Sequence, residues 1–352
     1  MYPLAEGMFA PRNHWYVAAW SSEIGREPFG RWLLNEPVAF YRTADGEAVA
    51  VQDRCPHRHF PLSKSRLVGD DIECGYHGLT FNRHGRCVRI PSERGVSQAF
   101  DIRSYPVVER WQWVWIWPGD PALADPALIP DHDALGITAG SFETIGDIYY
   151  PVPGRYMLMH DNLLDLTHLA FLHRSTIASD GLSDAAEIRD QGAGWISSRR
   201  ALSNVACPLY FQQTFAYAGQ VDRAFGMKSF LPCLHSGFDE FRRPQSDPDD
   251  AGGELGTIRV HHAITPGRLH DAHYFFAFGR NFAQGDAAFG EAMVSGLRVT
   301  LEEDMTATRE IEQLLQGYDV VPDELLLRSD AHCVDGRRRF EALIRAEQGS
   351  AA

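Results

Sequence analysis

The first fifty residues alternate apolar and polar positions in short runs that end at turn residues. Such runs fit half-buried strands, because successive side chains on a strand point to opposite faces of a sheet. Residues 43–46, Thr-Ala-Asp-Gly, are typical of a hairpin turn. The pattern predicts an all-β opening with strands near residues 15–20, 31–34, 38–42 and 48–51.

A proline-rich stretch, with prolines at 118, 121, 126 and 130, indicates a linker. We therefore divide the chain into domains at residues 1–125 and 126–352. In the second domain, strand-like runs lie at 142–152 and recur between 195 and 282, while the Asp-, Pro- and Gly-rich stretch 239–256 predicts a loop. The strand-like runs of the later region are 210–217, 257–264 and 273–282.

Helical periodicity appears near the C-terminus. Phe289, Met293, Leu297, Leu301 and Met305 repeat every four residues, which predicts one long helix with a buried stripe. More helix is expected between residues 323 and 348. The fold class is therefore α+β, with an all-β domain followed by a domain that mixes a sheet with helices.

Residues 162–173, Asn-Leu-Leu-Asp-Leu-Thr-His-Leu-Ala-Phe-Leu-His, also read as a helix. At about 100° per residue, Asn162, Asp165, His168 and His173 share an arc of roughly 140°. Two imidazoles and a carboxylate are the facial triad of non-haem Fe(II) sites. The alternative is a pair of histidines that bond to a carbonyl or to water, and the segment alone favours neither. His168 and His173 reach one ion only if the helix bends or ends near His173.

Two Cys/His pairs form a second candidate metal site. Cys55 and His57 are separated by one residue, and Cys74 and His77 by two, with a turn between the pairs. Either a Cys2His2 zinc or a Rieske [2Fe–2S] cluster fits these ligands. Structural zinc sites usually take their ligands as Cys-Cys and His-His pairs, so the mixed pairs favour the Rieske cluster.

The carboxylate of the triad is expected on the C-terminal helix, which offers Glu302, Glu303 and Asp304. Measured from Leu301, Asp304 lies at about −60°, within the buried stripe, whereas Glu302 and Glu303 lie at about 100° and 200°. Asp304 is therefore the predicted ligand. Glu303 is explained by a capping box that begins at Thr300.

Other histidines and aromatics have simpler readings. In residues 258–264, alternation groups His262 with the apolar face, so His262 rather than His261 is expected at an interior cavity. Contact with substrate and a satisfied core histidine explain it equally well. Four tryptophans alternate along residues 111–117, and core packing where two domains meet explains them better than a binding platform.

Composition narrows the class of function. The 352 residues carry a net charge of −14 without a basic run, which argues against nucleic acid or an anionic membrane as partner. Neither a transmembrane stretch nor a signal peptide is expected, so we predict a cytoplasmic protein. Six cysteines are too sparse for a disulfide framework.

Together and in this order, the two sites resemble the oxygenase component of Rieske non-haem iron oxygenases, in the vanillate O-demethylase, dicamba O-demethylase and toluenesulfonate monooxygenase group. Further stretches carry the likeness along nearly the whole chain: 13–18, 33–38, 105–110, 161–165, 280–282 and 301–304. The resemblance implies a Rieske domain followed by a catalytic domain with a helix-grip-like antiparallel sheet.

The resemblance also implies site roles. Asp165 would bridge His168 to a cluster histidine, His77, of a neighbouring subunit in a head-to-tail homotrimer. Asn162 would tune the iron coordination, and His262 would contact the substrate. His160 departs from the family, in which an apolar residue is common. The cluster ligands would be Cys55, His57, Cys74 and His77, and the iron ligands His168, His173 and Asp304.

The implied function is a terminal oxygenase that uses O2 and electrons from a separate flavin reductase or ferredoxin, since this chain shows no convincing nicotinamide or flavin motif of its own. O-demethylation of a small aromatic methyl ether is the leading hypothesis. Hydroxylation of a ring or methyl group and N-dealkylation are alternatives on the same scaffold. A Rieske electron carrier without oxygenase activity is disfavoured, because it would need only the first third of the chain.

Overall fold

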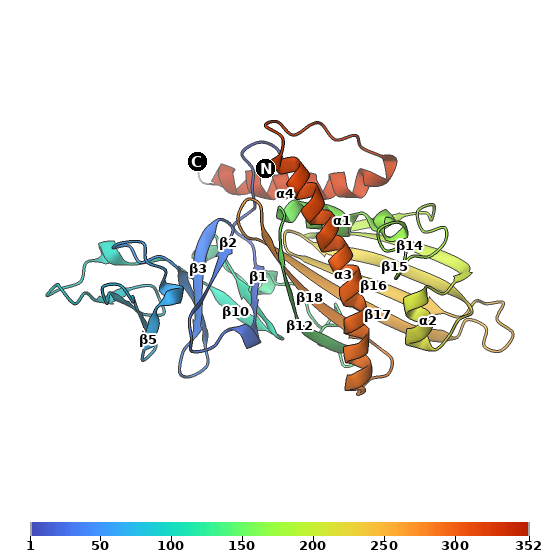
Figure 1. The fold of residues 1–352 in the computed structure, drawn as a ribbon, viewed down its shortest axis with the longest axis horizontal. Coiled ribbons are helices and arrows are strands. Elements are labelled where there is room, and N and C mark those ends of the chain that lie inside the picture. The colour runs from blue at the N-terminus through green and yellow to red at the C-terminus, as the bar shows by residue number, and fades with distance from the viewer. Residues whose placement is uncertain (1, 351–352) are drawn as a thin grey trace.

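The computed structural model describes residues 2–350, and its N-terminal part is all β, as predicted. Three small antiparallel sheets have the strand orders β1-β11-β10, β2-β3-β4-β9 and β5-β6-β7-β8. The third sheet lies at the far end of this part (Figure 1). The strands are β1 Tyr16–Trp20, β2 Phe29–Leu33, β3 Glu36–Arg42, β4 Ala48–Gln52, β5 Arg66–Val68, β6 Asp71–Glu73, β7 Thr80–Phe81, β8 Cys87–Arg89, β9 Ser104–Tyr105, β10 Val107–Arg110 and β11 Trp113–Ile116.

The second part is built on one seven-stranded antiparallel sheet of order β12-β18-β17-β16-β15-β14-β13. Its helices lie to one side, with α3 crossing the sheet and α4 above it (Figure 1). The predicted α+β class is confirmed. The strands are β12 Glu143–Val152, β13 Ile188–Gly192, β14 Trp195–Ala206, β15 Gln220–Phe230, β16 Leu234–Arg242, β17 Glu254–Pro266 and β18 Ala272–Arg280; the helices are α1 Tyr156–Leu164, α2 Leu209–Phe215, α3 Ala287–Gln316 and α4 Ala331–Ser350.

The alternating tryptophans pack where the two parts meet. Trp113, Trp115 and Trp117 are buried in one cluster with Leu234 and Phe275 of the large sheet. Their indole rings cannot therefore serve as an exposed binding platform, and the core-packing interpretation is confirmed. The domain boundary at residue 125 stays a prediction.

Two predictions of secondary structure between residues 195 and 282 were wrong. Residues 210–217 were expected to form a strand, but they lie mostly in α2, where Phe211 packs against Phe241 at 4.3 Å between ring centroids. Tertiary packing of the aromatic side chains thus overrides their β propensity. The loop predicted at 239–256 is shorter, because β16 continues to Arg242 and β17 begins at Glu254.

A buried ion pair joins α3 to the start of α1. Glu312 accepts hydrogen bonds from Nε and NH2 of Arg155 at 2.6 and 2.9 Å and from the Arg155 backbone N–H at 3.0 Å. Both side chains are nearly inaccessible to solvent. The pair therefore fixes α3, which carries Asp304, to the helix that leads into the histidines.

We expect Glu312→Leu to lower the free energy of unfolding by about 3–5 kcal/mol, because it leaves the Arg155 guanidinium buried without a partner. Burial alone would raise the pKa of Glu312, but the hydrogen bonds from Arg155 hold it at about 2. Its stabilising effect is thus complete above the ordinary glutamate pKa and is lost as pH falls toward 2. Urea unfolding at several pH values measures both effects. An equal cost in the control Glu310→Leu, an exposed residue of α3, would contradict the assignment.

None of the helices in the described residues 2–350 is both long and apolar enough to cross a membrane.

Candidate metal centres

The segment that carries the two histidines is not one helix. The helix predicted at 162–173 ends at Leu164, where Asp165 leaves helical geometry with φ −103° and ψ 93°. Its carboxylate Oδ1 accepts hydrogen bonds from the Thr167 backbone N–H and hydroxyl at 2.9 and 2.6 Å, and so caps a short 3-10 helix over Leu166–Ala170. This break is what lets His168 and His173 point to one place despite their spacing of five.

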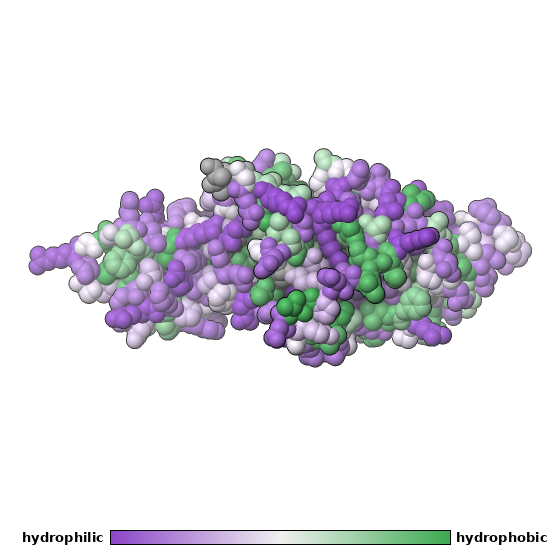
Figure 2. Space-filling view, turned by 90° about the horizontal axis from the view of Figure 1, so that it is seen from above, coloured by the Kyte–Doolittle hydropathy of each residue, from purple (hydrophilic) through white to green (hydrophobic). Residues whose placement is uncertain are grey.

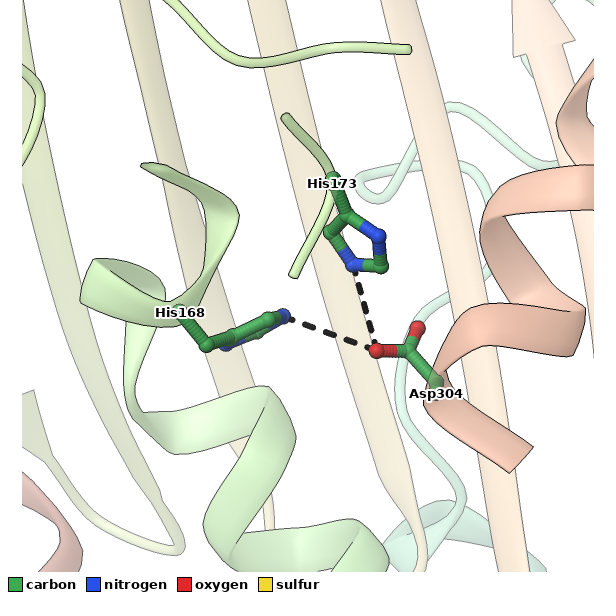
Figure 3. A group of neighbouring side chains, drawn as sticks. All are labelled: His168, His173 and Asp304. Carbon is green, nitrogen blue, oxygen red and sulfur yellow. Dashed lines mark ion pairs between the residues drawn. The ribbon is translucent and has the colours of Figure 1, made fainter. Parts of the chain in front are cut away.

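His168, His173 and Asp304 come together between the helical segments and the large sheet, whose strands pass behind them (Figure 3). Nε2 of His173 lies 3.1 Å, and Nε2 of His168 3.7 Å, from Oδ1 of Asp304. His168 projects from the 3-10 helix, His173 from the following turns and Asp304 from α3. We find one group of three or more Cys, His, Asp or Glu side chains within residues 2–350 whose ligand atoms lie within 4.8 Å of one another, and it is this one.

Hydrogen bonds on the far side of each ring orient the imidazoles. Nδ1 of His168 bonds to the Asp165 backbone carbonyl, and Nδ1 of His173 lies 2.7 Å from Oε2 of Glu303. Because a carbonyl and a carboxylate only accept, both Nδ1 atoms carry hydrogen. Each ring therefore turns its Nε2 atom toward the centre, where a metal ion would take the place of a proton, as in metal-binding histidines.

The electrostatics suit a cation at this point. Burial lowers the pKa of His168 and keeps it neutral. Burial alone would raise the pKa of Asp304, but the hydrogen bond and charge of His173 lower it, so the carboxylate is ionised. For His173, burial alone would lower the pKa, but its hydrogen bonds to the carboxylates of Asp304 and Glu303 raise it. Two imidazoles and one carboxylate with open positions fit non-haem Fe(II).

Asn162 lies at the same centre. Its Nδ2 donates to Oδ1 of Asp304 at 3.0 Å, while its Oδ1 is buried and has no hydrogen-bond partner in the described chain. A buried amide oxygen without a donor is costly. The amide oxygen is therefore a further group that a ligand at this centre would satisfy.

Glu303 is the residue whose role sequence reasoning missed. It was explained as part of a capping box, but α3 begins at Ala287, so Glu303 lies in the middle of the helix. Its carboxylate instead orients His173 and also lies 3.4 Å from the Ser175 hydroxyl. A signal was available, since Glu303 adjoins Asp304 and a metal-binding histidine usually needs a second acceptor.

We expect Glu303→Gln to weaken iron binding about 10- to 100-fold, because an amide holds the Nδ1 hydrogen of His173 less strongly than a carboxylate does. Competition with a chelator, followed by iron analysis, measures the change. Glu302→Gln is the matched control, since Glu302 is exposed on the same helix. Equal iron retention in the two variants would contradict an orienting role for Glu303.

The Cys/His pairs lie on two loops of the same construction. The Cys55 carbonyl accepts the His59 N–H and the Cys74 carbonyl accepts the Gly78 N–H, each at 2.9 Å. His59 and Gly78 both have positive φ, at 57° and 73°. His59 therefore serves the loop as Gly78 does, through its backbone conformation, which glycine adopts most readily.

The two loops separate thiols from imidazoles. Cys55 and Cys74 are buried, and burial together with the Cys74 thiol raises the pKa of Cys55 to about 11. His57 and His77 are exposed, with ring centroids 4.5 Å apart. A single zinc would hold all four ligand atoms within about 4 Å of one another, and no such set occurs in the described residues. A buried pair of thiols and an exposed pair of imidazoles fit a two-iron cluster, in which each pair binds one iron.

A cavity of about 110 Å³ opens beside the iron residues and is mostly apolar. His262 lines it and His261 does not, as alternation predicted. Nδ1 of His262 meets the Tyr274 hydroxyl at 2.5 Å, and Nε2 is buried without a partner. Arg223 also lines the cavity, but its guanidinium is held by the Asp239 carboxylate at 2.7 and 2.9 Å. The cavity thus presents one unsatisfied polar atom from His262.

His160 lies outside this cavity. Its Nδ1 is 2.6 Å from Nε2 of His235, whose Nδ1 is 2.7 Å from the Ser229 hydroxyl. Burial lowers the pKa of His160 to about 3, so the ring is neutral. His160 therefore ties α1 to strands β15 and β16 and belongs to the core rather than to the iron set.

Comparison with known proteins identifies the domains that carry the two candidate sites. A family model for the Rieske [2Fe–2S] domain matches residues 14–106, and one for the vanillate O-demethylase oxygenase C-terminal domain matches residues 152–346. The iron-sulfur subunit of the toluene-4-sulfonate monooxygenase system of Comamonas testosteroni is 36% identical over 97% of this chain and 99% of its own. The oxygenase component of dicamba O-demethylase from Stenotrophomonas maltophilia is 33% identical over 96% and 98%.

Solved structures show the same architecture. Dicamba monooxygenase bound to 3,6-dichlorosalicylic acid superposes with a TM-score of 0.86 and 31% identity, over 96% of this chain and 98% of its own. The match spans both metal centres. The chain is therefore a Rieske oxygenase component of the vanillate O-demethylase family.

Proposed function

We propose that this Rieske oxygenase removes a methyl group from a small aryl methyl ether. The observation that carries the proposal is the iron set of His168, His173 and Asp304, which opens into a small apolar cavity with one unsatisfied polar atom. Its volume is on the order of the ~150 Å³ apolar cavity that accepts benzene. Relatives named for O-demethylation of vanillate and of dicamba support the reaction class.

The proposed metal ligands are those that the geometry groups. Cys55, Cys74, His57 and His77 would hold the [2Fe–2S] cluster, and His168, His173 and Asp304 a mononuclear Fe(II), as in a dicamba monooxygenase structure described with non-haem iron. When bound, the cluster relays single electrons and the iron activates O2. The overall reaction balances as ArOCH3 + O2 + 2 e⁻ + 2 H⁺ giving ArOH, CH2O and H2O.

The protein's own residues bind and orient the ring. We infer that the Tyr274 hydroxyl donates to Nδ1 of His262, its bonding partner, because this tautomer leaves hydrogen on Nε2 to face the cavity. Burial lowers the pKa of His262 to about 4, which keeps this donor neutral. An acceptor on the substrate would bond to Nε2, while Leu163, Leu297 and Phe276 contact the ring and exclude water.

A separate donor must supply electrons, and relatives are named as components of multicomponent systems. We propose a ferredoxin or flavin reductase as that donor. The cluster loops belong to the N-terminal part, whose far end carries β5, whereas α1 lies beside the large sheet (Figure 1). We further propose a head-to-tail homotrimer, in which the cluster of one subunit serves the iron of the next.

Two surface features support the trimer. Oδ2 of Asp165 accepts no hydrogen bond within the described chain and is free for a histidine of a neighbour. Apolar side chains are also exposed near the iron loop and between α3 and α4, including Phe171 at 74%, Leu325 at 92% and Leu327 at 71%. From above, apolar side chains gather in patches on the half opposite the Rieske end (Figure 2). Exposed apolar patches mark interaction surfaces.

Turnover of a panel of methoxybenzenes, with formaldehyde and phenol both quantified, tests the reaction. Equal amounts of the two are expected, and ethoxy analogues should release acetaldehyde. Ring-hydroxylated products with the ether intact would refute O-demethylation. The variant His262→Leu should raise KM for substrates that carry an acceptor and leave KM for plain anisole unchanged.

A further inference from the structure

A second cavity, of about 420 Å³, lies on the other face of the large sheet. Side chains alternate between faces along a strand. On β17, Ile258, Val260 and His262 line the iron cavity, so Arg259 points to the opposite face. Residues 131–135, which precede β12, close one side. The volume is within the range of small-molecule sites.

Strand register brings three cations to this cavity. Arg199, Gly226, Phe238 and Arg259 are direct partners across β14, β15, β16 and β17. In the neighbouring row, Lys228 lies between Ser197 and Ser236. Gly226 has no side chain, and a Cβ there would meet the Phe238 ring at 2.8 Å. The ring therefore lies over the glycine, with cations around it.

These cations lack counter-ions. In the chain from residue 2 to 350, no carboxylate lies within 4 Å of the charged groups of Arg199, Lys228 or Arg259, although the protein carries an overall charge of −14 and pairs many of its arginines. Asp131 is the acidic residue among those that line the cavity, and the charge of Glu240 also acts on Arg259 without forming an ion pair, so three positive charges face two negative charges. The Asp131 carboxylate already accepts two backbone N–H groups.

Arg259 is the cation whose surroundings most clearly favour a bound anion. Its Nε is buried and has no hydrogen-bond partner in the described chain. Its guanidinium lies over Phe142 and Phe238 at 5.3 and 5.6 Å, and burial lowers its pKa. A buried guanidinium N–H without an acceptor is costly, even where the rest of the group is partly exposed. An anion in the cavity would remove this cost.

The geometry points to a site for a small aromatic anion, such as a sulfonate or carboxylate, on the face of the sheet away from the iron. The cations would bind the anionic group, and the Ser197 hydroxyl lies beside it as a further donor, whereas the Ser236 hydroxyl is already bonded to Nδ1 of His261 at 3.0 Å. Rings of Trp195, Phe230 and Phe238 form apolar walls, of which Trp195 also holds the Lys228 ammonium at 4.0 Å.

This site differs from the iron cavity in charge. In the iron cavity the one cationic side chain, Arg223, is neutralised by Asp239, whereas here the cations are unpaired. Met227 and Phe238 line both cavities, so an anion bound here would lie close behind the iron cavity. The site does not depend on which reaction the iron supports.

Titration calorimetry of the assembled, metal-loaded protein with benzenesulfonate tests the proposal. This probe is always anionic and has no methyl group to oxidise. We expect saturable binding that weakens with salt, and little binding of the neutral analogue phenyl methyl sulfone. Lys228→Met and Arg259→Met should each weaken binding about tenfold or more, because each removes a charged contact.

Arg199→Met provides a variant at an exposed position, where misfolding is not expected, and should also weaken binding. The matched control is Arg94→Met, an exposed arginine of the Rieske domain, which should leave affinity unchanged. His262→Leu should also leave it unchanged. Unchanged affinity in all three cavity variants, loss of binding in His262→Leu, or a changed oligomeric state in the cavity variants without an effect on affinity would each overturn the proposal.

Discussion

Asp304→Ala is expected to abolish product formation and to remove the mononuclear iron. Asp304 supplies the negative charge of the ligand set, and its Oδ1 faces both histidine Nε2 atoms and the amide of Asn162. Alanine leaves two neutral imidazoles on a buried site, which cannot offset the desolvation of Fe(II). Total iron should fall from about three per chain to about two, since the cluster keeps its own pair.

The cluster is a built-in control for folding in this experiment. Its visible and EPR spectra should match those of the unaltered protein, because Cys55, Cys74, His57 and His77 lie in another domain. Glu302→Ala removes the same charge from an exposed position two residues away on α3 and should keep three irons and full activity. A third iron retained in Asp304→Ala would show that this carboxylate is not a ligand.

That the two Cys/His pairs lie close together could be predicted from the sequence. The candidate ligands come as two pairs within 23 residues, each on a turn, so their proximity depends on local structure. The first four strands of the Rieske domain were also predictable, since period-two alternation is a local property. Asp304 required one further step, the assumption that a long helix continues through it, which α3 bears out.

The predictions that were wrong concern segments in which local preferences compete with side-chain caps or with contacts to distant residues. The helix predicted at 162–173 does not form as one element, because the Asp165 side chain caps a new turn, which competes with continued α-helix. Residues 210–217 became helical because Phe211 and Phe215 pack on Phe241. Glu303 was misassigned because its partner, His173, is 130 residues away, and no periodicity links the two.

Asp165→Asn is expected to keep all three irons and yet lower product formation about 100-fold. Asparagine preserves the helix cap and removes only the charge. Its side-chain oxygen still caps the 3-10 helix through the Thr167 N–H, since Asn and Asp are equally good N-caps. Only the negative charge is lost, and with it the charge-assisted hydrogen bond that Oδ2 would make to a cluster histidine of the neighbouring subunit.

Product formed by chemically reduced protein in a single turnover, together with the oligomeric state, measures the effect. Thr167→Val is the matched control, because it removes a contact to Oδ1 at 2.6 Å and leaves the charge. If Asp165→Asn forms product at the normal rate, the carboxylate serves only as a helix cap, and the coupling between subunits must run through other residues.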